Sequence, residues 1–171
     1  MKRIFTVLIL VLTLVFVLTS CGFEAPPKIK EGKFNFSVTY EQNGELKTLS
    51  GVYVCEYAGR SFTLEGGRFD REWEGHIEGI EGADEIYNSA VLICTTEDGG
   101  EIYLDFDLTA AHMMGEPYLA DATIEPSFFL VYPNEDHTSS EYGGGDEEIE
   151  ERYGLRIISY EYDAPIENTF N

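Results

Sequence analysis

Acidic side chains are the residues best supplied for chemistry in this chain, and they are dense between residues 133 and 151. The oxygen-bearing side chains there include Asn134, Glu135, Asp136, Asp146, Glu147 and Glu148. Calcium takes about six to eight oxygen ligands, so carboxylates gathered from neighbouring loops would suit it. The segment lacks the D-x-D-x-D-G order of an EF-hand, and solvation alone also explains an acidic loop. The calcium candidates are Asp136, Asp146 and Glu147, and no other cofactor is expected.

Groupings typical of catalysis do not stand out. The three histidines lie in separate segments, at His76, His112 and His137, and no G-x-S-x-G elbow is present. Acid pairs that could hydrolyse a glycoside occur at Asp105 with Asp107 and at Glu72 with Glu74. A chain with 32 Asp+Glu offers such pairs by chance. We therefore expect a protein that is not an enzyme, with an envelope-polymer hydrolase as an alternative.

Two cysteines, Cys55 and Cys94, lie inside apolar runs that read as strands. A disulfide between them would close a loop of about forty residues and stabilise the fold by roughly 3–4 kcal/mol on the chain-entropy estimate. The alternative is a pair of buried thiols that act as small hydrophobic residues. No CxxC and no zinc-like Cys/His spacing is present.

The first twenty residues differ in kind from the rest. Lys2 and Arg3 precede an apolar run from residue 4 to residue 18, as in a signal peptide. As a helix this run would reach only about 22 Å, short of a hydrocarbon core of about 30 Å. The run ends in Leu18-Thr19-Ser20-Cys21, which resembles the lipobox of bacterial lipoproteins. The resemblance implies cleavage before Cys21, lipidation of its sulfur, and a protein anchored on the extracytoplasmic face of the cell membrane.

The charge of the chain is strongly negative, with 11 Lys+Arg against 32 Asp+Glu. Removal of residues 1–20 leaves nine basic against 32 acidic residues, a net charge of −23. This balance argues against contact with a nucleic-acid backbone. It also predicts repulsion from anionic lipid, so we expect the lipid to hold a domain that stands off on a flexible tether over residues 21–32.

Beyond residue 32 the apolar residues alternate with polar ones, as in strands. The clearest strand begins at Lys33 and runs into the turn Gln42-Asn43-Gly44-Glu45, where Asn43-Gly44 favours a type I′ hairpin turn. Further strands are expected at 46–57, with a possible bulge at Gly51, and at 61–64, 68–80, 86–96, 101–108, 118–124, 127–132 and 155–162. A capped helical turn is expected after Thr109, and at most a short helix from Asp146. Odd-numbered residues of 68–80 should face the core.

Together these patterns predict an all-β domain over residues 33–164, an antiparallel sandwich or small barrel of about eight to nine strands. It carries the acidic loop 133–151 and ends in a tail at 165–171. Several tyrosines alternate out of phase with their apolar neighbours and could form a ring-lined outer face: Tyr53, Tyr57, Tyr103, Tyr160 and Tyr162. We expect a non-enzymatic binding module of the cell envelope whose partner is a protein or a glycan. A calcium-binding envelope module is the other alternative.

Overall fold

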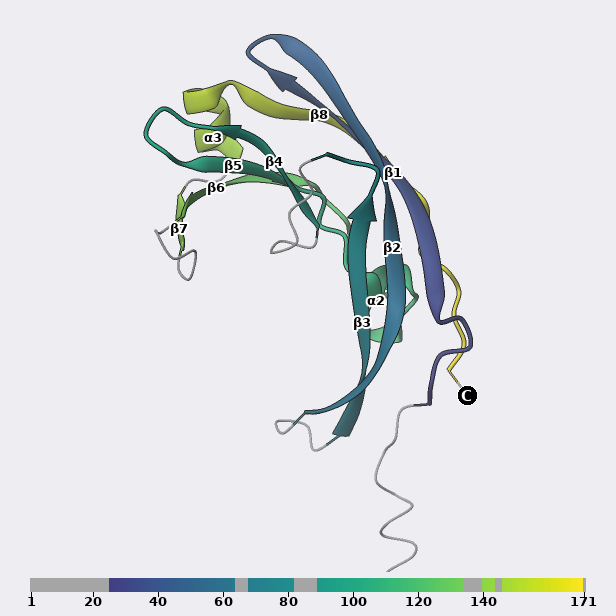
Figure 1. Ribbon diagram of the computed structural model, residues 1–171. Helices are drawn as coiled ribbons and strands as arrows, with labels where there is room; N and C mark the ends of the chain where they lie inside the picture. Colours follow the sequence, from purple (N-terminus) through teal and green to yellow (C-terminus); the bar gives the residue numbers. More distant parts are fainter. Residues whose placement is uncertain (1–24, 64–67, 82–88, 134–139, 144–145, 171) are drawn as a thin grey trace, which may run out of the picture.

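The strands form two antiparallel sheets, with strand orders β3-β2-β1-β8 and β4-β5-β6-β7 (Figure 1). The computed structural model describes residues 25–63, 68–81, 89–133, 140–143 and 146–170. In chain order the elements are β1 (Glu31–Gln42), β2 (Glu45–Thr63), β3 (Arg68–Glu78), β4 (Ala90–Thr95), β5 (Glu101–Asp105), α2 (Ala110–Met113), the 3-10 turn η1 (Pro117–Leu119), β6 (Ser127–Pro133), β7 (Ser140–Gly143), α3 (Asp146–Tyr153) and β8 (Leu155–Tyr162). The mostly β, antiparallel character predicted from the sequence is confirmed. The sheets do not close into a barrel, so the barrel alternative is wrong.

The first sheet is built on the predicted hairpin. Asn43 and Gly44 both have positive φ, at 53° and 84°, as a type I′ turn requires. The two strands expected at 46–57 and 61–64 are one strand, β2, which pairs with β1 over residues 45–56 and with β3 over residues 52–63. Its irregularity lies between Tyr57 and Gly59 rather than at Gly51, because Gly59 has a φ of 123° that other residues rarely adopt.

The strand expected at 68–80 is β3, and its odd-numbered residues are the more buried set, as predicted. The last strand, β8, matches the predicted range and joins β1. The strand expected at 118–124 is wrong. Its alternation rests on Ala120 and Ala122, which are too small to fill a core. The chain instead turns through η1, where the Leu119 N–H donates to the Glu116 carbonyl.

The helical segments lie where they were expected. A single turn, α2, follows Thr109, and α3 begins at Asp146 within the acidic stretch. The expected cap on α2 is wrong, because the Thr109 side chain makes no capping hydrogen bond. That stretch also holds β7, which the sequence did not suggest. Among the described residues, no helix combines the length and apolar character needed to cross a membrane.

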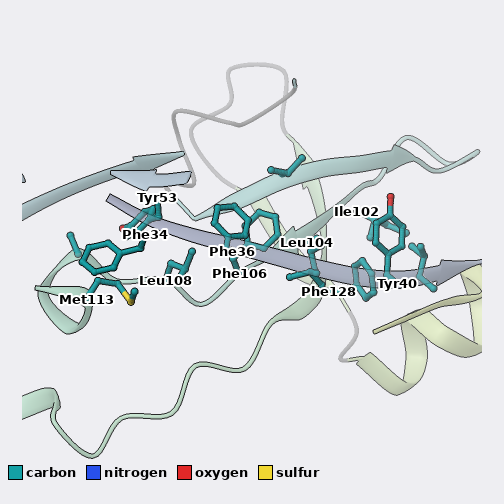
Figure 2. Packing of buried hydrophobic residues seen from close by; sticks show 14 of the residues in the cluster. Phe34, Phe36, Tyr40, Tyr53, Ile102, Leu104, Phe106, Leu108, Met113 and Phe128 are labelled. Carbon is teal, nitrogen blue, oxygen red and sulfur yellow. The ribbon is translucent and has the colours of Figure 1, made fainter. Parts of the chain in front are cut away.

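The core lies between the inner faces of the two sheets (Figure 2). Phe36 of β1 packs on Phe106 with ring centroids 4.5 Å apart, and Tyr40 packs on Phe128 at 5.9 Å. The remainder of the long first sheet is covered by α2 and its neighbours, which contribute Met113 and Met114, both fully buried. The first sheet thus extends beyond the second, so the molecule has two distinct ends.

Candidate functional site

A hollow of about 670 Å³ opens between the tips of the β1–β2 and β4–β5 hairpins and the end of α3. We call it the distal pocket; its lining residues are Gln42, Asn43, Cys94, Thr95, Thr96, Glu97, Asp98, Arg152 and Tyr153. Its volume falls in the range of small-molecule sites. In Figure 1 the three elements meet at the upper left, at the opposite end from the start of β1.

The pocket is shaped by a contact between the first hairpin turn and the end of α3. The Asn43 N–H donates to the Gly154 carbonyl at 3.0 Å. Gly154 ends the helix with a φ of 62°, and a Cβ there would lie 2.9 Å from Asn43 Oδ1. Only glycine permits this close approach at low cost. Tyr153, the last residue of α3, is thereby fixed in the pocket wall.

Asp98 is the most connected acidic residue of the pocket. It accepts hydrogen bonds from Thr96 Oγ1 at 2.5 Å and from Tyr132 Oη at 3.0 Å. These bonds, from Thr96 first and Tyr132 second, hold the pKa of the Asp98 carboxyl below its usual range. The same contact raises the pKa of Tyr132, which donates to the carboxylate. Asp98 is therefore a charged acceptor with a fixed orientation.

Next to Asp98 the pocket wall combines a cation with a buried hydroxyl, and Arg152 Nη2 lies 4.0 Å from Asp98 Oδ2. Arg152 donates to Glu148 at 3.0 Å, which raises the pKa of Arg152, and its guanidinium lies 5.1 Å from the Tyr153 ring centroid. Tyr153 Oη is buried near Tyr132 but makes no hydrogen bond of good geometry. A buried hydroxyl in this state is costly unless a water or ligand satisfies it.

The cysteines are free thiols, Cys55 buried and Cys94 partly buried in the pocket wall. Cys55 lies opposite Gly32 of β1, whereas Cys94 lies near Gln42 at the other end of that strand. Ten residues of strand separate these positions by roughly 33 Å along the chain, and a disulfide needs Cα atoms within about 7 Å. The disulfide considered for this pair is therefore wrong. Burial raises the pKa of Cys94, and that of Cys55 to about 12, so both are poor nucleophiles.

The acid pairs considered for hydrolysis have other positions. Asp105 accepts hydrogen bonds from Ser89 Oγ at 2.6 Å and from the Asp107 N–H at 2.8 Å. Asp107 accepts from the Glu125 N–H at 3.1 Å. Both thus brace the end of β5, while Glu72 and Glu74 are exposed on β3.

The calcium candidates are only partly described. Asp136 lies outside the described residues, as do Asn134 and Glu135, while Asp146 begins α3. Glu147 is exposed, and Glu148 pairs with Arg152. Within the described ranges, no three His, Cys, Asp or Glu side chains are grouped to hold a metal ion.

The histidines and tyrosines are also dispersed. His112 Nδ1 lies 3.0 Å from the Leu119 carbonyl, His76 Nε2 lies 3.7 Å from Glu78, and His137 is outside the described residues. The five tyrosines do not form one exposed face. Tyr53 and Tyr103 are buried, Tyr57 and Tyr162 are half-buried, and Tyr160 is exposed.

A second cluster, at the other end of the first sheet, joins the two ends of the described chain. Glu116 is 1% exposed and accepts from Arg71 Nε at 2.6 Å, Arg71 Nη2 at 2.8 Å and Trp73 Nε1 at 2.7 Å. Arg71 Nη1 donates to the Ala25 carbonyl at 3.1 Å, and the guanidinium lies 4.0 Å from the ring centroid of Phe170. We call this group the clasp. One feature of the sequence could have indicated the clasp. Arg71 is the lone charged residue on the core-facing side of β3, so it needs a buried partner.

Backbone contacts extend the clasp. Lys28 N–H donates to the Thr169 carbonyl at 3.0 Å, and Pro27 forms a β-bridge with Phe170. The Asn168 side chain bonds both the N–H and the carbonyl of Ile29. Residues 25–30 are therefore fixed to the domain. The flexible tether that was expected over residues 21–32 does not include them. Residues 166–170 are likewise not a free tail. Cys21 itself lies outside the described residues.

No family model, curated protein or solved structure matches the chain. The chemistry of the distal pocket follows from its lining. It offers hydroxyl, amide and carboxylate acceptors, a guanidinium donor and the Tyr153 ring. These groups suit the binding of a polar ligand.

Proposed function

We propose that this chain is a lipid-anchored, extracytoplasmic binding module of the cell envelope, not an enzyme, built on an open β-sandwich. The lipobox-like Leu18-Thr19-Ser20-Cys21 supports the anchor. The observation that carries the proposal is that the clasp and the distal pocket lie at opposite ends of β1. Strand β1 has 12 residues and so spans about 40 Å. A domain anchored near Ala25 would present its pocket away from the membrane.

We propose that the ligand is a glycan segment of the envelope. Sugar hydroxyls both donate and accept hydrogen bonds, and the pocket supplies partners of both kinds in Asp98, Asn43 and Arg152. The ring of Tyr153 adds an apolar surface on which a sugar face can pack. The buried Tyr153 hydroxyl would gain a partner when a ligand binds. An envelope protein that presents a polar side chain to the same groups is the other partner considered.

Binding is tested by calorimetric titration of soluble glycan fragments of the envelope into the protein. Asp98→Ala and Tyr153→Phe should each weaken binding at least several-fold, because each removes a polar group from the wall. Glu161→Ala, an exposed acid on β8 outside the pocket, is the matched control. Equal affinity for all four proteins would overturn the pocket as the site.

The anchor is tested separately by cell fractionation. Cys21→Ala should move the protein out of the membrane fraction without loss of folding, because stable attachment needs the acyl chains. A variant that stays quantitatively in the membrane would overturn the lipid anchor. A chelator that lowers the unfolding temperature at constant ionic strength would favour the calcium-binding alternative instead.

A further inference from the structure

We infer that the clasp end of the molecule is itself a membrane-contacting surface that rests on the lipid headgroups. We call it the anchor face and define it by Lys28, Ile29, Lys30, Arg60 and Phe62. The inference rests on the proposed lipid anchor at Cys21. It replaces the expectation that the domain stands off from the bilayer with a domain whose anchor face touches the headgroups.

Exposed apolar side chains mark this face. Ile29 is 43% exposed and Phe62 is 51% exposed. Phe62 keeps only a partial cover from Phe69, with ring centroids 5.1 Å apart. Each exposed group is next to cations, Ile29 between Lys28 and Lys30, and Phe62 two residues after Arg60. Apolar side chains set among basic ones are typical of surfaces that lie in the membrane interface.

The contacts of the clasp bring these residues to one end of the molecule. Strand register places Arg60 opposite Arg71 and Phe62 opposite Phe69. Arg71 in turn holds Ala25, and the Tyr57 N–H donates to the Lys30 carbonyl at 2.8 Å. In Figure 1 the β2–β3 end and the start of the described chain both lie at the bottom, away from α3.

The length of chain between lipid and clasp leaves little room for separation. Ala25 is four residues after Cys21, and four residues reach at most about 14 Å. The polar layer on each side of a bilayer is itself several ångströms thick, roughly 5–8 Å. With the acyl chains inserted, the clasp end would lie in or immediately above the headgroups.

Negative charge is concentrated away from the anchor end, which favours this orientation at an anionic membrane. Residues 25–33 and 60–71 together hold six Lys or Arg and three acids. Lys33 pairs with Glu78 and Arg71 pairs with Glu116, so with these two acids the net charge of this part is +1. The rest of the mature chain holds three Lys or Arg and 27 acids, a net charge of −24. The nearby C-terminal segment adds Glu167, which makes the anchor end neutral. An anionic bilayer therefore repels the rest of the domain far more strongly than it repels the anchor end.

The test places a fluorescent reporter at each end of the lipidated full-length protein. Phe62→Trp reports on the anchor face, and Leu46→Trp is the matched control, since Leu46 is 67% exposed beside the distal hairpin turn. The proteins are reconstituted into phosphatidylglycerol and phosphatidylethanolamine vesicles with or without brominated acyl chains. Wild-type protein gives the background from Trp73. We expect the tryptophan emission of Phe62→Trp to be quenched by the brominated lipid and shifted to shorter wavelength, and the emission of Leu46→Trp to show neither change.

Vesicle flotation of the same samples separates this inference from the anchor. Protein that floats with vesicles while Phe62→Trp is quenched no more than Leu46→Trp would overturn the anchor face and leave the lipid anchor intact. Quenching at both positions would overturn the orientation. Wild-type protein that fails to float would overturn the anchor and the inference with it. Ile29→Trp repeats the test if Phe62→Trp does not fold.

Discussion

The clasp makes a sharp prediction about stability. Glu116→Gln keeps the size of the side chain but removes the charge that faces Arg71. The guanidinium, whose side chain is 6% exposed, would then be a buried cation without the Glu116 carboxylate. Breaking one side of a buried ion pair costs about 3–5 kcal/mol, because the remaining charge is not solvated. We expect the free energy of unfolding to fall by that amount.

The assay is urea unfolding followed by circular dichroism, with Glu41→Gln as the control. Glu41 pairs with Arg156 at 2.8 Å, but the two side chains are 31% and 53% exposed. An exposed pair contributes roughly 0.2–1 kcal/mol. The double variant Arg71→Met with Glu116→Leu should recover much of the loss, since it leaves no buried charge. Equal small losses in Glu116→Gln and Glu41→Gln would refute the reasoning.

Three further predictions follow from single contacts. Gly75→Ala should destabilise by about 1–3 kcal/mol, because its Cβ would overlap the buried Tyr53 ring, and adding Tyr53→Phe should recover part of this loss in thermal unfolding. Mass spectrometry after treatment with a thiol reagent should show slow labelling of Cys94, faster as the pH rises, and labelling of Cys55 only on unfolding; an oxidised intramolecular pair would contradict the strand geometry. The lowered pKa of Asp98 contributes stability above its ordinary value of 3.8 that is lost as the pH falls. Asp98→Asn should therefore reduce the drop in unfolding temperature between about pH 6 and about pH 3, and an unchanged drop would count against the Thr96 and Tyr132 contacts.

The sequence predicted the elements whose signal is local. The β1–β2 turn needs two adjacent residues with positive φ, and Asn43-Gly44 supplies them. The strands expected at 68–80 and 155–162 were likewise close to the observed β3 and β8. The segment 118–124 failed because alternating small residues imitate a strand while the hydrogen bonds belong to a turn.

The sites were less predictable because they join distant parts of the chain. Glu116 and Arg71 are 45 residues apart, and nothing near either residue specifies the other. The distal pocket depends on the contact of Asn43 with Gly154, which arises only when α3 packs beside the first hairpin. The dense acidity of residues 133–151 indicated a site there, whereas Asp98 and Glu116, which accept hydrogen bonds from fixed partners, lie outside that segment.

The join between Ile29 and Asn168 spans 139 residues of sequence. A chain that emerges with its N-terminus first therefore has its opening segment in place long before the partner of that segment exists. Contacts of such wide separation are late and slow to form. Loss of the last few residues would remove the hydrogen bonds that hold the first segment of the domain. Truncation at the C-terminus should therefore first loosen the N-terminal segment.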